Sequence, residues 1–311
     1  MSELSPQLRL LRDFYYKKAL KLPAEGGVAH ARELIDKPAF FTLEHLQRHL
    51  NNPLLTPGWF SLIWQGQPVD CTPAMGSKSV QKGELSFLKE SIIEEYLSRG
   101  AALLLRGIEF FEPAINAMCG AIDAPPDHVM ASAIASFSQR GNETQSLRAN
   151  TYDTLMIHLG GQMMWRIYAR PEPGYPTPEM TPRHVGKQQA EIVMNHGDAL
   201  YLKNGIPHIA ETTGKYALHM SFEIYDQNLN AATALNLLTQ EFNLDSTRAY
   251  SPAKGVVEKL LQRAQTSAYW QRVHELQVKQ AENCRRGRAV IGNNRVTHLA
   301  GLIALERKAS A

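Results

Sequence analysis

The middle of the chain holds a series of short β-rich runs, and this series constrains the fold more than any other feature. The runs are "HVMASAIASFS", "YDTLMIHLGG", "QMMWRIYAR", "AEIVMNHGDALYLKNG" and "YALHMSFEIYD", with Gly, Asn or Pro between them. In the first run, Val129 and Ala131 alternate with Met130 and Ser132. A period of two residues is that of a strand, and several short strands separated by turns indicate an antiparallel barrel or sandwich.

Helical patterns lie on both sides of this region. Apolar residues recur at helical spacing in "PQLRLLRDFYYKKALKL" and in "LSFLKESIIEEYLSRG", which ends at Gly100. The pattern returns after residue 228 in "NAATALNLLTQEF" and "VVEKLLQRAQTSAYWQRVHEL". We therefore expect a mostly β core with helical flanks, divided into a mostly helical segment over residues 1–84, a barrel over 85–227 and a helical region over 228–311.

The stretch "RPEPGYPTPEMTPRHVGK" interrupts the β-rich series. Each proline lacks a backbone N–H, so the stretch cannot be a helix or a central strand. It predicts a long surface loop over residues 170–186, inserted between two barrel strands.

Composition places the chain among soluble globular proteins. Its 311 residues are 44% hydrophobic and 20% charged, and the formal net charge of +3 is too small to indicate a nucleic-acid or membrane partner. Cys71, Cys119 and Cys284 form no CxxC pair, which favours a reducing compartment over a disulfide framework or a zinc site. Because no secretory leader and no apolar run of about 18 residues is present, we expect a cytoplasmic protein.

Two blocks of the β-rich region carry a family resemblance. The first is "RANTYDTLMIHLGGQMMWRIY", Arg148 to Tyr168, and the second is "GDALYLKNGIPH", Gly197 to His208. They resemble H-x-D-x-Y-D-x-x-x-x-Q-x-x-G-x-(K/R)-x-W and G-D-x-L-Y-x-P-x-G-x-x-H of the JmjC-type cupin family, particularly its bacterial ribosomal-oxygenase-like branch. Lys203 stands where proline is usual. The resemblance covers roughly residues 85–225 and implies a double-stranded β-helix (cupin, jelly-roll) that uses Fe(II) and 2-oxoglutarate.

The spacing of Asp153, Gly161 and Trp165 fixes the register of the first block against the family pattern. In that register the metal histidine, the metal carboxylate, the 2-oxoglutarate anchor and the glutamine fall on Arg148, Asn150, Met163 and His158. Only the distal histidine, His208, is kept. A guanidinium has no lone pair for a metal, a neutral amide is a poor iron ligand, and a thioether cannot hold a carboxylate.

Two other arrangements would restore a metal site. A register shifted by three residues pairs Asp153 with His208, but it displaces Gly161 and Trp165 and turns the strand over. Alternatively, His158 and His219 could join His208 in a rebuilt cluster, since His219 lies on a neighbouring β-rich run.

These observations favour a cupin that has lost the usual iron triad and 2-oxoglutarate anchor. It would bind a small molecule, a peptide or a protein partner, or run metal-independent chemistry, in a pocket of Arg148, Asn150, Met163, His158, His208 and His219. Arg148 and Asn150 would form an anion- or amide-binding pair. The alternative is an active non-heme oxygenase with a non-standard Fe(II) and 2-oxoglutarate site, acting on a small molecule, amino acid or peptide. The resemblance also implies a homodimer.

Overall fold

The structure is a computed structural model in which two compact units are distinguished, residues 1–122 with 131–224 and residues 123–130 with 225–311. Each unit is described by itself. The described residues are 6–23, 27–36, 40–52, 55, 58–81, 83–123, 129–139, 143–170, 185–226, 258, 261–276, 278–279 and 282.

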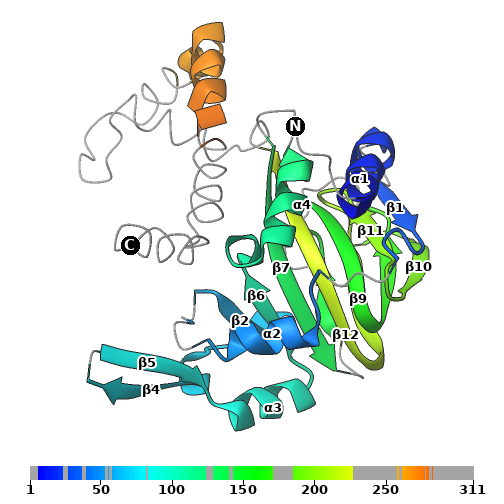
Figure 1. The fold of residues 1–311 in the computed structure, drawn as a ribbon. Coiled ribbons are helices and arrows are strands. Elements are labelled where there is room, and N and C mark those ends of the chain that lie inside the picture. The colour runs from blue at the N-terminus through cyan, green and yellow to red at the C-terminus, as the bar shows by residue number, and fades with distance from the viewer. Residues whose placement is uncertain are drawn as a thin grey trace, which may run out of the picture. The chain divides into compact units, whose positions relative to one another are not determined.

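A ten-stranded sheet forms the core of the first unit (Figure 1). Its main path runs β1-β11-β9-β12-β7-β6-β2-β3, while β10 pairs with β9 and β8 pairs with β12. The longest strands, β9 (Asp153–Tyr168) and β12 (His208–Asp226), pair antiparallel at its centre. Around them lie β6 (Ala102–Arg106), β7 (Val129–Gln139), β8 (Glu143–Arg148), β10 (Gln188–Met194) and β11 (Ala199–Leu202). The predicted β-rich core with flanking helices is confirmed.

The first 84 residues contribute strands to this sheet as well. β1 (Val28–Ala31) pairs antiparallel with β11, and β2 (Phe60–Trp64) pairs with β6 and with β3 (Gln67–Pro68). A separate hairpin of β4 (Met75–Val80) and β5 (Gly83–Leu88) projects from the sheet (Figure 1). The described part of residues 1–84 therefore contains both helices and strands, and β5 extends past residue 84.

Helices form where local sequence signals are strong. α1 (Pro6–Asp13) continues into a π-helical turn, Phe14–Lys18, and a 3-10 turn, Ala19–Lys21. Thr42 caps α2 (Leu43–Leu50) by accepting from the backbone N–H of His45. The predicted helix before Gly100 is present as α3 (Glu90–Ser98), and Gly100 has the positive φ of a helix C-terminus. A further helix, α4, spans Pro113–Asp123. Short 3-10 turns cover Thr72–Ala74 and Ile108–Phe110.

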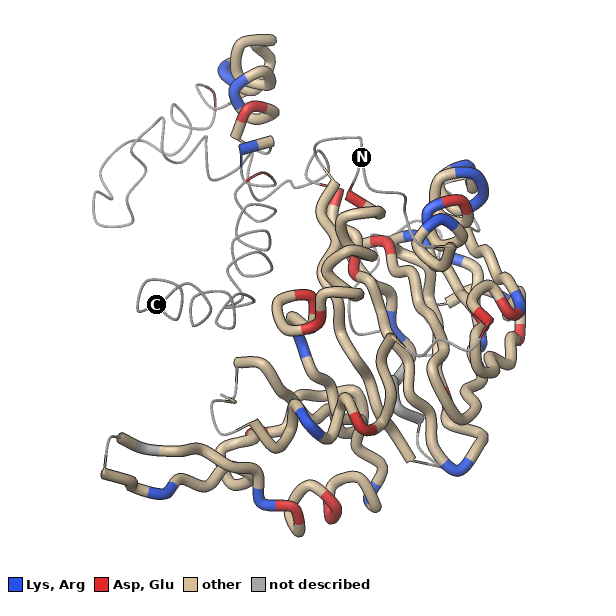
Figure 2. The backbone as a smooth tube through the Cα atoms, viewed as in Figure 1, with Lys and Arg blue, Asp and Glu red and all other residues tan. Residues whose placement is uncertain are grey.

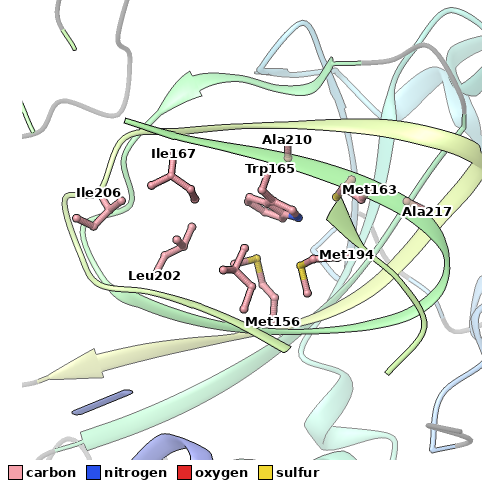
Figure 3. Packing of buried hydrophobic residues seen from close by; sticks show 10 residues of the cluster. Met156, Met163, Trp165, Ile167, Met194, Leu202, Ile206, Ala210 and Ala217 are labelled. Carbon is pink, nitrogen blue, oxygen red and sulfur yellow. The ribbon is translucent and has the colours of Figure 1, made fainter. Parts of the chain in front are cut away.

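Apolar side chains fill the space that β9, β10, β11 and β12 enclose (Figure 3). Trp165 lies in this cluster with Met156, Met163 and Met194. The strands around it carry few charges: β7 and β11 contain no Asp, Glu, Lys or Arg. Charged residues gather instead on helices, turns and outer strands (Figure 2). A buried charge inside this barrel is therefore unusual.

A bulge in β9 sets which side chains face this interior. His219 is opposite His158, but Ala217 is already opposite Gly161, so the register shifts between them. Gly161 has φ 72°, and a Cβ there would lie 1.8 Å from the carbonyl oxygen of Tyr216. Only glycine fits this position, and the bulge changes the alternation of side chains beyond it.

In the second unit, helical residues 261–264 and 267–276 are described, where Tyr269 and Val273 pack with Ala264 and Leu276. Apart from residues 258, 265–266, 278–279 and 282, the rest of the predicted helical region over 228–311, including Cys284, lies outside the described residues, as do residues 171–184 of the predicted loop. Cys71 and Cys119 are free thiols. Among the described residues, no helix is both long and apolar enough to cross a membrane.

Candidate functional site

A cavity of about 100 Å³ lies inside the barrel of the first unit. Four of the predicted pocket residues line it: Arg148, Asn150, His208 and His219. The remaining lining residues are Ile63, Leu104, Arg106, Ile134, Ser136, Tyr152, Thr154, Met156, Trp165, Ser221 and Glu223. The cavity therefore combines polar and charged groups with an apolar wall.

Strand pairing brings Arg148 and His208 together. Arg148 is the last residue of β8, His208 is the first of β12, and the two are direct partners across the ladder. Pro207 precedes β12, and the backbone N–H of Gly205 donates to the carbonyl oxygen of Asn150 at 2.7 Å. That bond ties the turn before His208 to the segment after Arg148. Backbone hydrogen bonds therefore hold Arg148 and His208 next to each other.

The two histidines of the cavity are neutral at physiological pH. The Nδ1 atom of His208 donates to the carbonyl oxygen of Ile206 at 2.9 Å. Burial, followed by the positive charge of Arg148, lowers the pKa of His208 to about 3. Burial, then His158 and Arg148, lowers the pKa of His219 to about 3. The Nδ1 atom of His219 has no hydrogen-bond partner among the described residues.

Arg148 places a cation beside these neutral rings. Its Nε atom is buried and has no hydrogen-bond partner in the described part of the chain. Burial lowers the pKa of the guanidinium, while Tyr152 and Glu223 raise it and Arg106 lowers it. A guanidinium keeps its proton in proteins, so Arg148 remains charged.

Tyr152 and Glu223 lie close to Arg106 and Arg148, and the Glu223 carboxylate carries the charge opposite to that of the two arginines. The Tyr152 hydroxyl donates to Glu223 Oε1 at 2.5 Å. Burial and the neighbouring Glu223 carboxylate raise the pKa of Tyr152, so the phenol keeps its proton. Arg106 and Arg148 against Glu223 leave the lining with one net positive charge.

The barrel is similar in sequence to a known domain family. The sequence profile of the JmjC domain family matches residues 118–232. The chain carries a JmjC domain. Over 82 residues it is 29% identical to the bifunctional lysine-specific demethylase and histidyl-hydroxylase NO66 of Aedes aegypti. That match covers 24% of this chain and spans only 13% of the length of the relative.

Solved structures agree on the fold. The X-ray structure of Escherichia coli YcfD gives a TM-score of 0.53 at 14% identity, over 84% of this chain and 69% of that chain. YcfD, a ribosomal oxygenase, in complex with cobalt and 2-oxoglutarate gives 0.50 at 14% identity, over 86% and 70%. The predicted cupin, jelly-roll fold and the resemblance to the JmjC-type family are confirmed.

The residues of this JmjC domain do not fit the iron site that the family resemblance implies. Arg148 and Asn150 line the cavity with His208, and a guanidinium cannot coordinate a metal. Within the described ranges, no group of three His, Cys, Asp or Glu side chains could hold a metal ion. The rebuilt cluster of His158, His208 and His219 is therefore not formed.

Asp153, the carboxylate of the shifted register, is used elsewhere. It accepts from the Tyr201 hydroxyl and, at 2.8 Å, from the backbone N–H of Asn204. It is not among the residues that line the cavity. Asp153 instead supports the turn that leads to His208, so the structure does not favour its pairing with His208 at a metal.

Two predicted pocket residues of the JmjC domain lie outside the cavity lining. Met163 is buried in the apolar cluster, opposite Met194 of β10. His158 is fully buried opposite His219, and burial lowers its pKa to about 4. Neither ring nitrogen of His158 has a hydrogen-bond partner in the described residues.

Sequence reasoning did not include Arg106, Tyr152, Trp165 or Glu223 in the pocket. A signal for Glu223 exists in β12: from His219, every second residue, Ser221 and Glu223, shares the same face of the strand. The same alternation places Leu104 and Arg106 of β6 in the lining. Tyr152 and Trp165 are themselves aligned motif residues, but the motif does not indicate that they face the cavity.

Proposed function

We propose that this JmjC domain binds a small ligand in its barrel cavity without iron or 2-oxoglutarate. The observation that carries the proposal is the placement of Arg148 directly across the ladder from His208. The family resemblance puts a metal histidine at Arg148, and the guanidinium puts a fixed positive charge there instead. A divalent cation and a guanidinium repel each other in a buried site, where charge interactions are weakly screened.

The neighbouring groups support binding rather than metal chemistry. Asn150 donates through Nδ2 to Thr154 Oγ1 at 2.9 Å and offers its carbonyl oxygen to a ligand. His208 is buried, uncharged and held in one orientation by the Ile206 carbonyl. Polar groups that converge on a cavity beside an apolar wall can fix the orientation of a small ligand.

A second candidate, an oxygenase with a non-standard metal site, is favoured by the names of the similar proteins, which include a ribosomal oxygenase and a histidyl-hydroxylase. Metal binding separates the two. Anaerobic titration with Fe(II) and 2-oxoglutarate is followed by metal analysis and by the visible band of a metal-bound ketoacid. We expect no stoichiometric iron and no band.

A double variant, Arg148→His with Asn150→Asp, provides the matched comparison. It returns both residues to the family pattern beside His208, so it should bind Fe(II) more tightly than the natural sequence. Stoichiometric iron together with the ketoacid band in the unmodified protein would overturn the proposal.

A further inference from the structure

The cavity of the JmjC domain joins a buried cation to nearby hydrogen-bond acceptors, and this combination defines a ligand class. On the basis of the proposed iron-free site, we infer that the cavity binds a small 2-hydroxy monocarboxylate such as glycolate. The carboxylate would bind the Arg148 guanidinium, and the hydroxyl would donate to His208 or Asn150.

The carboxylate follows from the state of Arg148. Its buried Nε donor has no partner among the described residues, and a buried donor without an acceptor destabilises the protein. A carboxylate matches the fork geometry of a guanidinium and can accept two parallel hydrogen bonds from it. Because the lining has one net positive charge, a monoanion leaves the cavity neutral, whereas a dicarboxylate leaves it negative.

The hydroxyl follows from the acceptors. The Ile206 carbonyl can only accept, so Nδ1 of His208 carries the proton and Nε2 carries the lone pair. Asn150 uses Nδ2 as a donor to Thr154, which orients its amide and presents Oδ1 as a second acceptor. An unsubstituted acid would fill the space but leave these acceptors without a donor.

Cavity size limits the carbon chain. A cavity of about 100 Å³ admits a small acid of two or three carbons. Met156, Ile134 and Trp165 supply an apolar wall against which a methylene or methyl group can pack. Nδ1 of His219, which has no partner among the described residues, also lies in the lining and adds a polar contact.

Glycolate and propionate test the inference because they have the same number of non-hydrogen atoms and differ only in a hydroxyl against a methyl group. Each is titrated into metal-free protein by calorimetry, with phosphate and 2-oxoglutarate as competing anions. We expect saturable glycolate binding, and propionate binding weaker by about tenfold, the value of one hydrogen bond. This comparison uses the natural sequence and depends on no variant folding.

Arg148→Gln and Arg166→Gln separate the cavity cation from arginine content in general. Arg166 lies outside the lining and forms ion pairs with Glu191 and Glu211. Arg148→Gln should weaken glycolate binding by about tenfold or more, and Arg166→Gln should leave it within about twofold. Thermal unfolding of both variants checks that each is folded.

The failures are distinguishable. Equal binding of propionate, tighter binding of phosphate, or no saturable binding of glycolate would overturn the hydroxy-acid inference and leave the iron-free site standing. Binding of 2-oxoglutarate only when Fe(II) is present would overturn both.

Discussion

Two regions of the JmjC domain differ in whether their polar groups have hydrogen-bond partners within the protein. In the turns between strands, Asp198 accepts the backbone N–H groups of Glu33 and Asn195, both at 2.9 Å, and Asp153 accepts from Tyr201 and Asn204. In the cavity, nitrogen atoms of Arg148 and His219 are buried without a partner in the described residues. The turns are internally complete, whereas the cavity is not.

This difference separates structure from function. A buried charge that ends on backbone N–H groups fixes the chain, and its partners are part of the same molecule. A buried charge that lacks an acceptor costs free energy, and proteins keep such groups mainly where an outside molecule completes them. Asp153 and Asp198 therefore support the site, and Arg148 belongs to it.

The largest expected effect is a loss of folding stability at low pH, which comes from three buried histidines. His158, His208 and His219 are neutral when folded, with pKa values of about 4, 3 and 3, but titrate near 6.5 when unfolded. The unfolded state thus binds more protons below pH 6.5, so stability is complete above that pH and is lost as pH falls toward 4. At pH 5 the loss is about 2 kcal/mol per histidine, on the order of 6 kcal/mol in total.

Urea unfolding at pH 7.5 and pH 5 measures this loss. Because a typical domain has only about 5–15 kcal/mol of stability, the protein should be close to unfolding at pH 5. His158→Gln with His219→Gln should remove about two thirds of the pH dependence. A midpoint that does not move between the two pH values would show that these rings are solvated, contrary to their burial.

The second effect concerns the turns. Asp198→Ala should lower the free energy of unfolding by about 3 kcal/mol, because two backbone N–H groups lose a charged acceptor in a buried site. Asp13→Ala is the matched control, since its exposed pair with Lys17 contributes about 0.5 kcal/mol or less. Similar losses in both variants would mean that the Asp198 bonds do not hold the turn.

The third substitution is expected to leave the free energy of unfolding unchanged or to raise it. Arg148→Met removes a buried charge with an unpartnered donor and keeps much of the side-chain volume. The free energy of unfolding should stay the same or rise by about 1 kcal/mol, while glycolate binding is lost. A destabilisation above about 2 kcal/mol would assign Arg148 to the structural class of Asp198 instead. Chemical unfolding and calorimetry on the same sample give both readings.

Sequence alone predicted much of the barrel, because its long strands carry local alternation and Gly or Pro turns. It missed β1 and β2, which have four and five residues and pair with partners far along the chain. Runs this short have no reliable period, and non-local pairing decides their structure. The convergence of Arg148, Asn150 and His208 was available from motif spacing, since both blocks are well marked.

The rest of the site depended on features that spacing does not encode. The bulge at Gly161 changes the facing of β9, so motif position alone could not show that Met163 and His158 lie outside the lining. Arg106 and Glu223 reach the cavity from strands that carry no motif. Whether a buried nitrogen has a partner depends on every neighbour in space, so this property of Arg148 required the structure.

The smallest expected effect concerns a second arginine on the barrel. Arg166 follows the cavity residue Trp165 in β9, so its side chain leaves from the other face of the strand. Its Nε lies 3.4 Å from Glu191 and an Nη atom lies 3.2 Å from Glu211, with all three side chains partly in solvent. Arg166→Gln should change the free energy of unfolding by about 0.5 kcal/mol or less, because screened surface pairs contribute little. Urea unfolding at low and high salt measures the change. A loss above about 1 kcal/mol would show that Arg166, with its two ion pairs outside the cavity, matters as much as Arg148, whose Nε lacks a partner in the described residues, and the contrast between the two arginines would fail.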